Sequence, residues 1–323
     1  MPEPARDTIE SLQKRLRPRR KVWGISATLL PYDASGNVLV EAFQRHVQAT
    51  HQAGLMNAIN MDTGYVNFLS DGEKREVLGW TRDALGKNIP FVAGAYVEGR
   101  DGDLVGLYRR ELDLITSFDA IPILFPTARL HGKTANEKVE TCRLICKGYP
   151  QVLGFELSPR FAPNGEIFDE CTVTGLIEIP EMIGMKHSSL NRLLEFDRLA
   201  LRDRIRPEFR IFTGNDLGIN MIEYGSDYLL GLATFAPEKF AERDRAWESG
   251  DPAYYELSDA LQHLGSVAFR EPIPAYKHSA AVFLHLCGRI PTDSPHPTNA
   301  KRPPWEAEIL EDCRRRLFSS DRS

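Results

Sequence analysis

Long hydrophobic runs are missing from this 323-residue sequence. A membrane-spanning helix needs roughly 18 consecutive apolar residues, and no run approaches that length, so no membrane contact is predicted. The amino-terminal residues 1–20 mix acidic and basic side chains around no apolar core, which excludes a secretory signal or transit peptide. Cysteine is sparse, with five residues at scattered positions. An odd and scattered set is typical of reduced thiols, and it predicts a cytoplasmic location.

An excess of positive charge is also absent. The formal net charge is −5, which argues against nucleic acid or an anionic membrane surface as a partner. No Gly-x-x-x-x-Gly-Lys phosphate loop occurs, and no Ser–His–Asp order stands out. Cys142 and Cys146 lie one helical turn apart without a second ligand pair nearby, and His46 and His51 lie on a predicted helix. The sequence therefore predicts neither a metal site nor a bound cofactor.

Short apolar runs that alternate with helical periodicity fill most of the chain. Four to six apolar residues that end in a turn signal are typical of a buried strand. The predicted strands are Val22–Leu30, Leu55–Asn60, Phe91–Ala95, Ala120–Phe125, Val152–Phe155, Met182–Met185, Phe209–Phe212 and Tyr228–Leu232. A helix is predicted after each strand, among them Ser70–Leu85, where Ser70 and Glu73 form a capping box, and Leu217–Tyr224. About eight strand–helix units are the number that closes a parallel (β/α)8, or TIM, barrel.

The alternation of predicted strands and helices ends after Trp247. Helices are predicted over Asp251–Leu264, Ile273–Cys287 and Trp305–Leu317, with no strands between them. We therefore predict three parts: an amino-terminal arm over residues 1–20, the barrel over 21–249, and a C-terminal helical extension over 250–323 that packs on the barrel.

One lysine, Lys186, follows the apolar run Met182–Met185 directly. In a barrel the chemistry lies at the carboxyl ends of the strands, and Lys186 lies at one of these ends. An apolar interior penalises the ammonium form and lowers the pKa. A neutral amine can attack a ketone to form a Schiff base. The alternative is a lysine that extends its charge out of the strand end into water.

Five motifs, in this order along the chain, resemble the class I aldolases that include dihydrodipicolinate synthase and N-acetylneuraminate lyase. They are Gly24–Asp33, Asp62–Gly64 with the helix Glu73–Leu78, Gly184–Ser189, Thr213–Asp216, and Ala236-Pro237. The resemblance covers Val22 to about Gly288. It implies a TIM barrel whose lysine, here Lys186, condenses with pyruvate or a related 2-keto acid.

The resemblance also implies a set of substrate-binding residues. Thr63 matches the threonine that holds the keto-acid carboxylate together with neighbouring backbone N–H groups, to which Gly64 belongs. Arg160 has the offset of an arginine that helps to bind substrate carboxylates, and Asn215 lies in the motif after the seventh strand. Phe155 occupies the place of the family's tyrosine on the fifth strand, against the substrate.

The proton relay of the family is changed at three positions. Phe155 replaces the tyrosine that shuttles a proton, Asp62 replaces the first threonine of the loop, and Thr127-Ala128 replace a Tyr-Tyr pair. A phenyl ring cannot carry a proton, so this is not an ordinary dihydrodipicolinate synthase. We hypothesise that Lys186 still forms an imine and that Asp62 moves protons, because a carboxyl near an apolar strand end can have its pKa raised to a useful value. Tyr65, His131 and Glu156 are the other candidates.

The predicted function is therefore a Schiff-base lyase, aldolase or dehydratase. The alternative is a catalytically silent barrel that binds a carboxylated ligand. The resemblance further implies a homo-oligomer, a dimer or tetramer, although Ala128 stands where a neighbouring subunit's tyrosine often completes the relay.

Overall fold

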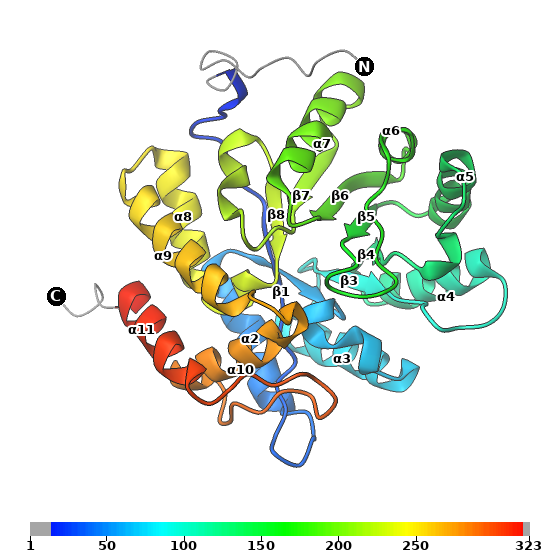
Figure 1. Ribbon diagram of the computed structural model, residues 1–323. Coiled ribbons are helices and arrows are strands. Elements are labelled where there is room, and N and C mark those ends of the chain that lie inside the picture. The colour runs from blue at the N-terminus through cyan, green and yellow to red at the C-terminus, as the bar shows by residue number, and fades with distance from the viewer. Residues whose placement is uncertain (1–13, 319–323) are drawn as a thin grey trace.

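The computed structural model describes residues 14–318, and its centre is a closed barrel of eight parallel strands in sequential order (Figure 1). The fold class predicted from the sequence is thereby confirmed. The strands are β1 (Gly24–Ala27), β2 (Met56–Ile59), β3 (Val92–Ala95), β4 (Ile121–Leu124), β5 (Val152–Leu157), β6 (Met182–Ser188), β7 (Arg210–Thr213) and β8 (Asp227–Leu230).

Helices surround the barrel because each strand is buried on both faces and needs an outer layer. They are α2 (Val40–Ala53), α3 (Asp71–Leu85), α4 (Leu104–Thr116), α5 (Ala135–Cys146), α6 (Glu170–Ile177), α7 (Arg192–Ile205) and α8 (Pro237–Ser249). The predicted capping box of α3 is confirmed, since Ser70 accepts from the Glu73 N–H and the Glu73 carboxylate binds the Ser70 N–H. Short 3-10 segments occupy several post-strand loops: η1 (Asp62–Gly64), η2 (Val66–Phe68), η3 (Ala128–Leu130), η4 (Ile219–Tyr224) and η5 (Leu232–Thr234).

Several predicted elements differ from the structure, and the first strand, predicted over Val22–Leu30, is limited to Gly24–Ala27. Strand β6 continues through Lys186 to Ser188 instead of ending at Met185, because β5 is also longer than predicted and pairs Phe155 with Lys186 and Leu157 with Ser188. The helix predicted over Leu217–Tyr224 is the 3-10 segment η4, which ends at the left-handed Gly225. Lys186 is thus part of the barrel wall and not of the loop after it.

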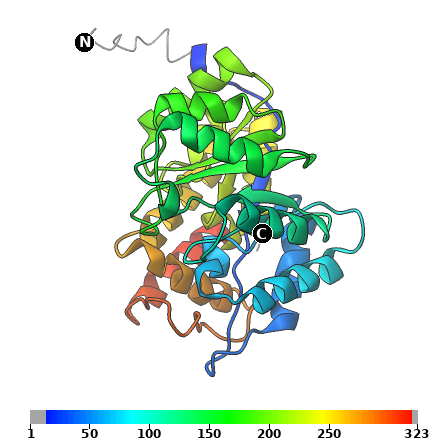
Figure 2. The same cartoon turned by 90° about the vertical axis from the view of Figure 1, so that its right-hand side faces the viewer.

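Three helices follow the barrel: α9 (Ala253–Ala268), α10 (Tyr276–Leu286) and α11 (Glu306–Phe318), with η6 (Ile273–Ala275) before α10. In Figure 1 and Figure 2 the orange and red C-terminal segments lie beside the blue and cyan first third of the chain. Side chains confirm this placement, because Tyr276 and Lys277 contact the loop after β2. The division of the chain after residue 249 stays a prediction.

The predicted amino-terminal arm lies partly outside the described residues, which begin at Lys14. From there the chain binds the rim of the barrel near the start of β8. The Arg17 N–H donates to the Glu223 carbonyl at 2.7 Å, and Arg20 forms an ion pair with Asp227 at 2.9 Å.

A buried ionic network fixes the β5–β6 pair from the outside. Successive strand residues point to opposite faces, so Glu156 and His187, the neighbours of Phe155 and Lys186, face the helices. His187 Nδ1 lies 2.5 Å from Glu156 Oε1, and Arg198 of α7 binds both Glu156 oxygens at 2.8 and 3.1 Å. Burial alone would raise the pKa of Glu156, but hydrogen bonds from His187 and Arg198 lower it below its usual value.

Replacing Glu156 by Ala should therefore destabilise the protein severely. The guanidinium of Arg198, which is 4% exposed, would remain buried without its partner, and breaking a buried ion pair on one side costs about 3–5 kcal/mol. Chemical denaturation measures this loss. The control is Glu170→Ala, because Glu170 and its partner Arg204 are both exposed at the surface and such a pair contributes about 0–1 kcal/mol. Equal losses for both variants would contradict the role of the network.

Candidate active site

The side chain of Lys186 lies inside the barrel and is 8% exposed. Its Nζ lies 4.6 Å from the centroid of the Phe155 ring, the residue it pairs with on β5. Burial lowers the pKa of Lys186 to about 8, and the charges of Asp216 and Asp62 oppose part of that shift. At neutral pH this amine is therefore much closer to its nucleophilic form than an ordinary lysine.

Gly214, in the loop after β7, makes room for this lysine. A Cβ atom at that position would lie 2.7 Å from Lys186 Cε and 2.0 Å from Ser188 Oγ. Any side chain there would displace the aliphatic part of the Lys186 side chain. The glycine within Thr213–Asp216 is therefore required for steric reasons.

Asp216 is a functional candidate to which the sequence assigned no individual role. It follows β7, is 3% exposed, and accepts a hydrogen bond from the Leu232 N–H at 2.7 Å. Burial raises its pKa to about 7, although the Leu232 N–H and the Lys186 amine favour the ionised form. The sequence signal that could have identified Asp216 is its position in a loop after a strand. The charges of Lys186 and Asp216 thus interact, and burial moves the pKa of each group toward neutral pH.

A chain of hydrogen bonds joins the loop after β2 to α10. Thr63 Oγ1 lies 2.8 Å from the Tyr276 hydroxyl, which donates to Asp62 Oδ2 at 3.0 Å. Lys277 Nζ donates to Asp62 Oδ1 at 3.1 Å, and its side chain is 2% exposed. The two predicted residues Asp62 and Thr63 are therefore neighbours in space as well as in sequence. Tyr276 and Lys277 were missed, because nothing local connects them to a site more than 200 residues earlier.

A cavity of about 290 Å³ opens beside Asp62 and Lys277. Its walls come from the loops after β2, β3, β4 and β5 and from the C-terminal segment near residue 299. Most of the lining is apolar or aromatic, and the polar groups are few: Asp62, Asn67, Asn164, Lys277, Thr298 and Asn299. Phe125 links the cavity to the lysine, because its ring lies 5.0 Å from that of Phe155. Such a space fits a small molecule with an apolar body and one or two polar groups.

Other predicted substrate-binding residues are engaged elsewhere. Arg160 is 57% exposed and pairs with Glu271, with Nη2 to Oε1 at 2.5 Å. The Asn215 amide donates to Glu195 at 2.6 Å and accepts from the Leu190 N–H, so its side chain is committed to the loop. The Gly64 N–H donates to the Met61 carbonyl inside η1. Their substrate-binding roles stay predictions.

The alternative proton carriers also lie apart from the lysine. The Tyr65 ring packs against Tyr32 and His296 at 5.6 Å, and burial raises the pKa of its hydroxyl far above the usual value. His131 is exposed and lies 3.3 Å from the Asn164 carbonyl. Glu156 faces the helices within its ionic network. Of the candidates named from the sequence, Asp62 alone lines the cavity.

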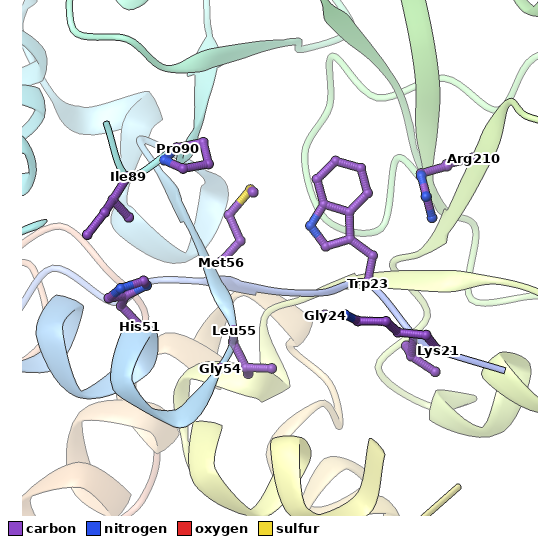
Figure 3. A pocket seen from close by; sticks show the side chains of 11 residues that line it. Lys21, Trp23, Gly24, His51, Gly54, Leu55, Met56, Ile89, Pro90 and Arg210 are labelled. Atoms are coloured by element: carbon purple, nitrogen blue, oxygen red, sulfur yellow. The ribbon is translucent and has the colours of Figure 1, made fainter. Parts of the chain in front are cut away.

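A larger cavity of about 540 Å³ lies at the opposite end of the barrel, where the strands begin (Figure 3). Figure 3 shows Lys21 and Arg210 on the side of Trp23, and His51 on the opposite side of the view, beyond Met56 and Leu55. Arg210 is already committed there, since it binds Asp227 at 2.6 Å and lies 4.8 Å from the Trp23 ring centroid. Barrel enzymes carry their chemistry at the carboxyl ends of the strands, so the smaller cavity beside Asp62 is the candidate site.

The described residues contain neither a metal-binding cluster nor a membrane-spanning helix. Within residues 14–318 no group of three or more His, Cys, Asp or Glu side chains is placed to hold a metal ion. The same described part of the chain contains no helix with the length and apolar character required to traverse a bilayer.

Comparisons with known proteins bear on the fold of the chain. No family model matches the chain. A 4-hydroxy-tetrahydrodipicolinate synthase from Kosmotoga olearia is 24% identical over 231 residues, which cover 70% of this chain and 75% of that protein.

Solved structures show the same fold. Dihydrodipicolinate synthase from Thermotoga maritima aligns with a TM-score of 0.76 and 16% identity over 93% of this chain and 99% of that chain. A prophage protein of the dihydrodipicolinic acid synthase family from E. coli K12, in complex with pyruvate, aligns with a TM-score of 0.77 and 15% identity over 92% of this chain and 98% of that chain. The dihydrodipicolinate synthase from Acinetobacter baumannii, also complexed with pyruvate, aligns with a TM-score of 0.75 and 18% identity over 92% of this chain and 99% of that chain. This chain is thus similar in sequence to a 4-hydroxy-tetrahydrodipicolinate synthase and shares the barrel fold of dihydrodipicolinate synthases.

Proposed function

We propose that the protein is a Schiff-base-forming lyase that acts on pyruvate or a related 2-keto acid through Lys186. The observation that carries the proposal is a buried amine in the barrel wall whose pKa is lowered to about 8. The pyruvate complexes of two structural neighbours support a small keto acid as the ligand.

The first chemical step uses the neutral amine. Lys186 Nζ attacks the ketone carbon, the carbonyl oxygen takes up protons and leaves as water, and a protonated imine remains. Asp216 is suited to supply a proton, since its pKa is raised to about 7 and its charge is coupled to the lysine. Thr63 would hold the carboxylate of the keto acid.

The second step uses the protonated imine as an electron sink. A base removes a proton from the carbon next to the imine, the C–H electrons form the carbon–carbon double bond of an enamine, and the imine nitrogen becomes neutral. Asp62 is the proposed base, because it stands where the family has the first relay threonine and it lines the cavity. Phe155 only shapes the apolar surface beneath the amine.

The enamine can then add to a carbonyl partner, or the reverse reaction can release one. The mainly apolar walls of the cavity beside Asp62 favour an apolar or aromatic aldehyde over a polyhydroxylated one.

A silent carboxylate-binding barrel is the second candidate, and the phenyl ring of Phe155 in place of a relay hydroxyl favours it. The two candidates differ in one measurable property. A working base exchanges the methyl protons of pyruvate with solvent deuterium, whereas a silent barrel does not.

Borohydride reduction in the presence of pyruvate should attach the keto acid covalently to the wild-type protein. Lys186→Ala should abolish the adduct seen by mass spectrometry, because Lys277, the amine that lines the cavity, is engaged in an ion pair with Asp62 at 3.1 Å. Lys74→Ala is the matched control, since Lys74 is equally buried but ion-paired with Asp71 at 2.9 Å, and it should trap pyruvate normally. Absence of any adduct with several 2-keto acids would refute the imine.

The rate of trapping should depend on pH with an inflection near 8. The reactive species is the neutral amine, and burial lowers the Lys186 pKa to about 8, so the rate should rise from pH 6 and level off above 9 (about one unit past the pKa). Asp216→Asn removes a charge that raises this pKa, and the inflection should therefore move to lower pH. A rate that keeps rising beyond pH 10 would show an ordinary, solvated lysine.

A further inference from the structure

Four polar groups stand in a row at the mouth of the barrel: the Thr63 hydroxyl, the Tyr276 hydroxyl, the Asp62 carboxylate and the Lys277 ammonium. The distances between successive partners are 2.8, 3.0 and 3.1 Å. Two come from the loop after β2 and two from the start of α10. The row thus connects the proposed carboxylate-binding hydroxyl with the proposed base.

Counting protons fixes the direction of these bonds. A carboxylate oxygen accepts but does not donate, and a hydroxyl has one proton. Tyr276 therefore donates to Asp62 Oδ2, and Thr63 must donate to the Tyr276 oxygen. Burial and the Asp62 charge raise the pKa of Tyr276 well above its usual value, so this hydroxyl keeps its proton and can only redirect it.

A carboxylate at Thr63 changes that pattern. To bind it, the Thr63 hydroxyl must turn its proton toward the ligand. The Tyr276 oxygen then loses its donor, and its own proton has two acceptors in reach, Thr63 Oγ1 and Asp62 Oδ2. Donation to Thr63 requires rotation about one C–O bond and releases Asp62 Oδ2.

The heavy atoms of the row are held in place while the proton turns. The Tyr276 ring stacks on Phe269 with centroids 4.3 Å apart and an interplanar angle of 18°. Lys277 holds Asp62 Oδ1 and lies 5.4 Å from the Tyr65 ring centroid. The side chain of Asp62 is 18% exposed and lines the cavity, so a proton that it accepts can exchange with water.

We propose that the Tyr276 hydroxyl is a switch that releases Asp62 as a proton acceptor when a keto-acid carboxylate occupies Thr63. This inference rests on the proposed imine chemistry. The C–H bond next to the protonated imine breaks, its proton binds Asp62 Oδ2, and its electrons form the enamine, so a cation and a carboxylate become two neutral groups. Tyr276 acts through Thr63 and Asp62 and is a positioning residue.

Pyruvate is the probe, and two readouts separate the steps. Borohydride trapping reports the imine, and loss of the pyruvate methyl signal in deuterium oxide reports proton removal. Tyr276→Phe should keep trapping and should not slow exchange, because loss of the hydroxyl leaves Asp62 Oδ2 free at all times. Thr63→Val should lower exchange, relative to trapping, about 100-fold, the lower end of an acid–base contribution, because Tyr276 then keeps donating to Asp62. Asp62→Asn, of nearly the same shape, should also keep trapping and lower exchange about 100-fold.

A double-mutant cycle tests whether Tyr276 works through Thr63. Exchange in Thr63→Val with Tyr276→Phe should recover toward the level of Tyr276→Phe, because the hydroxyl that holds Asp62 in Thr63→Val is then absent. The matched control is Tyr254→Phe, which removes another buried hydroxyl that donates to a carboxylate, Glu223 at 2.9 Å, and should leave both readouts unchanged.

The outcomes are distinguishable. Trapping with slowed exchange in Tyr276→Phe overturns the switch and leaves the imine standing, as does a double variant that exchanges as slowly as Thr63→Val. Trapping in the wild type without exchange overturns the switch and the proposed base together. Failure of the wild type to trap pyruvate overturns the proposed function itself.

Discussion

Removal of one amine from water is the interaction on which the candidate site depends. Lys186 lies in the wall of the barrel, above a phenyl ring that offers no hydrogen-bond acceptor. Water would stabilise the ammonium ion, and the apolar interior does not, so the neutral form becomes accessible. The two carboxylates that act on it, Asp216 and Asp62, are placed so that their charge offsets the penalty only in part.

Several residues around the lysine help to keep its amine uncharged and in one position. Gly214 leaves space for its stem, and the outward-facing Glu156, His187 and Arg198 fix the strand pair that carries it. The chemistry therefore combines an apolar inner face with an ionic outer face on the same two strands. Neither face alone would hold the amine both uncharged and in one position.

Much of the fold follows from local patterns, because apolar runs with turn signals mark each strand. The end of β6 was placed too early because Lys186, His187 and Ser188 are polar, and a pattern based on hydrophobicity stops at the first charge. Their pairing with β5 continues the strand regardless. Local patterns also point to Lys186, which directly follows the apolar run Met182–Met185, and to Asp62 and Thr63, which lie in the loop after β2.

The rest of the site depends on tertiary contacts that no local pattern contains. Tyr276 reaches Thr63 across 213 residues of sequence, from a helix that looks like a simple appendage. Nothing in the local sequence predicts the raised pKa of Asp216. It arises because the folded chain buries this carboxyl, which accepts a hydrogen bond from the Leu232 N–H. Arg160 has the spacing of a carboxylate-binding residue, yet in the structure it pairs with Glu271 at the surface.

The origin of Tyr276 and Lys277 in α10 also orders events during synthesis. A ribosome makes the eight strands before it makes this helix, so a nascent barrel can close while Asp62 still lacks both of its partners. The row of polar groups at the mouth is complete only when the later segment docks against the loop after β2. Assembly of the candidate site is thus a late event in synthesis.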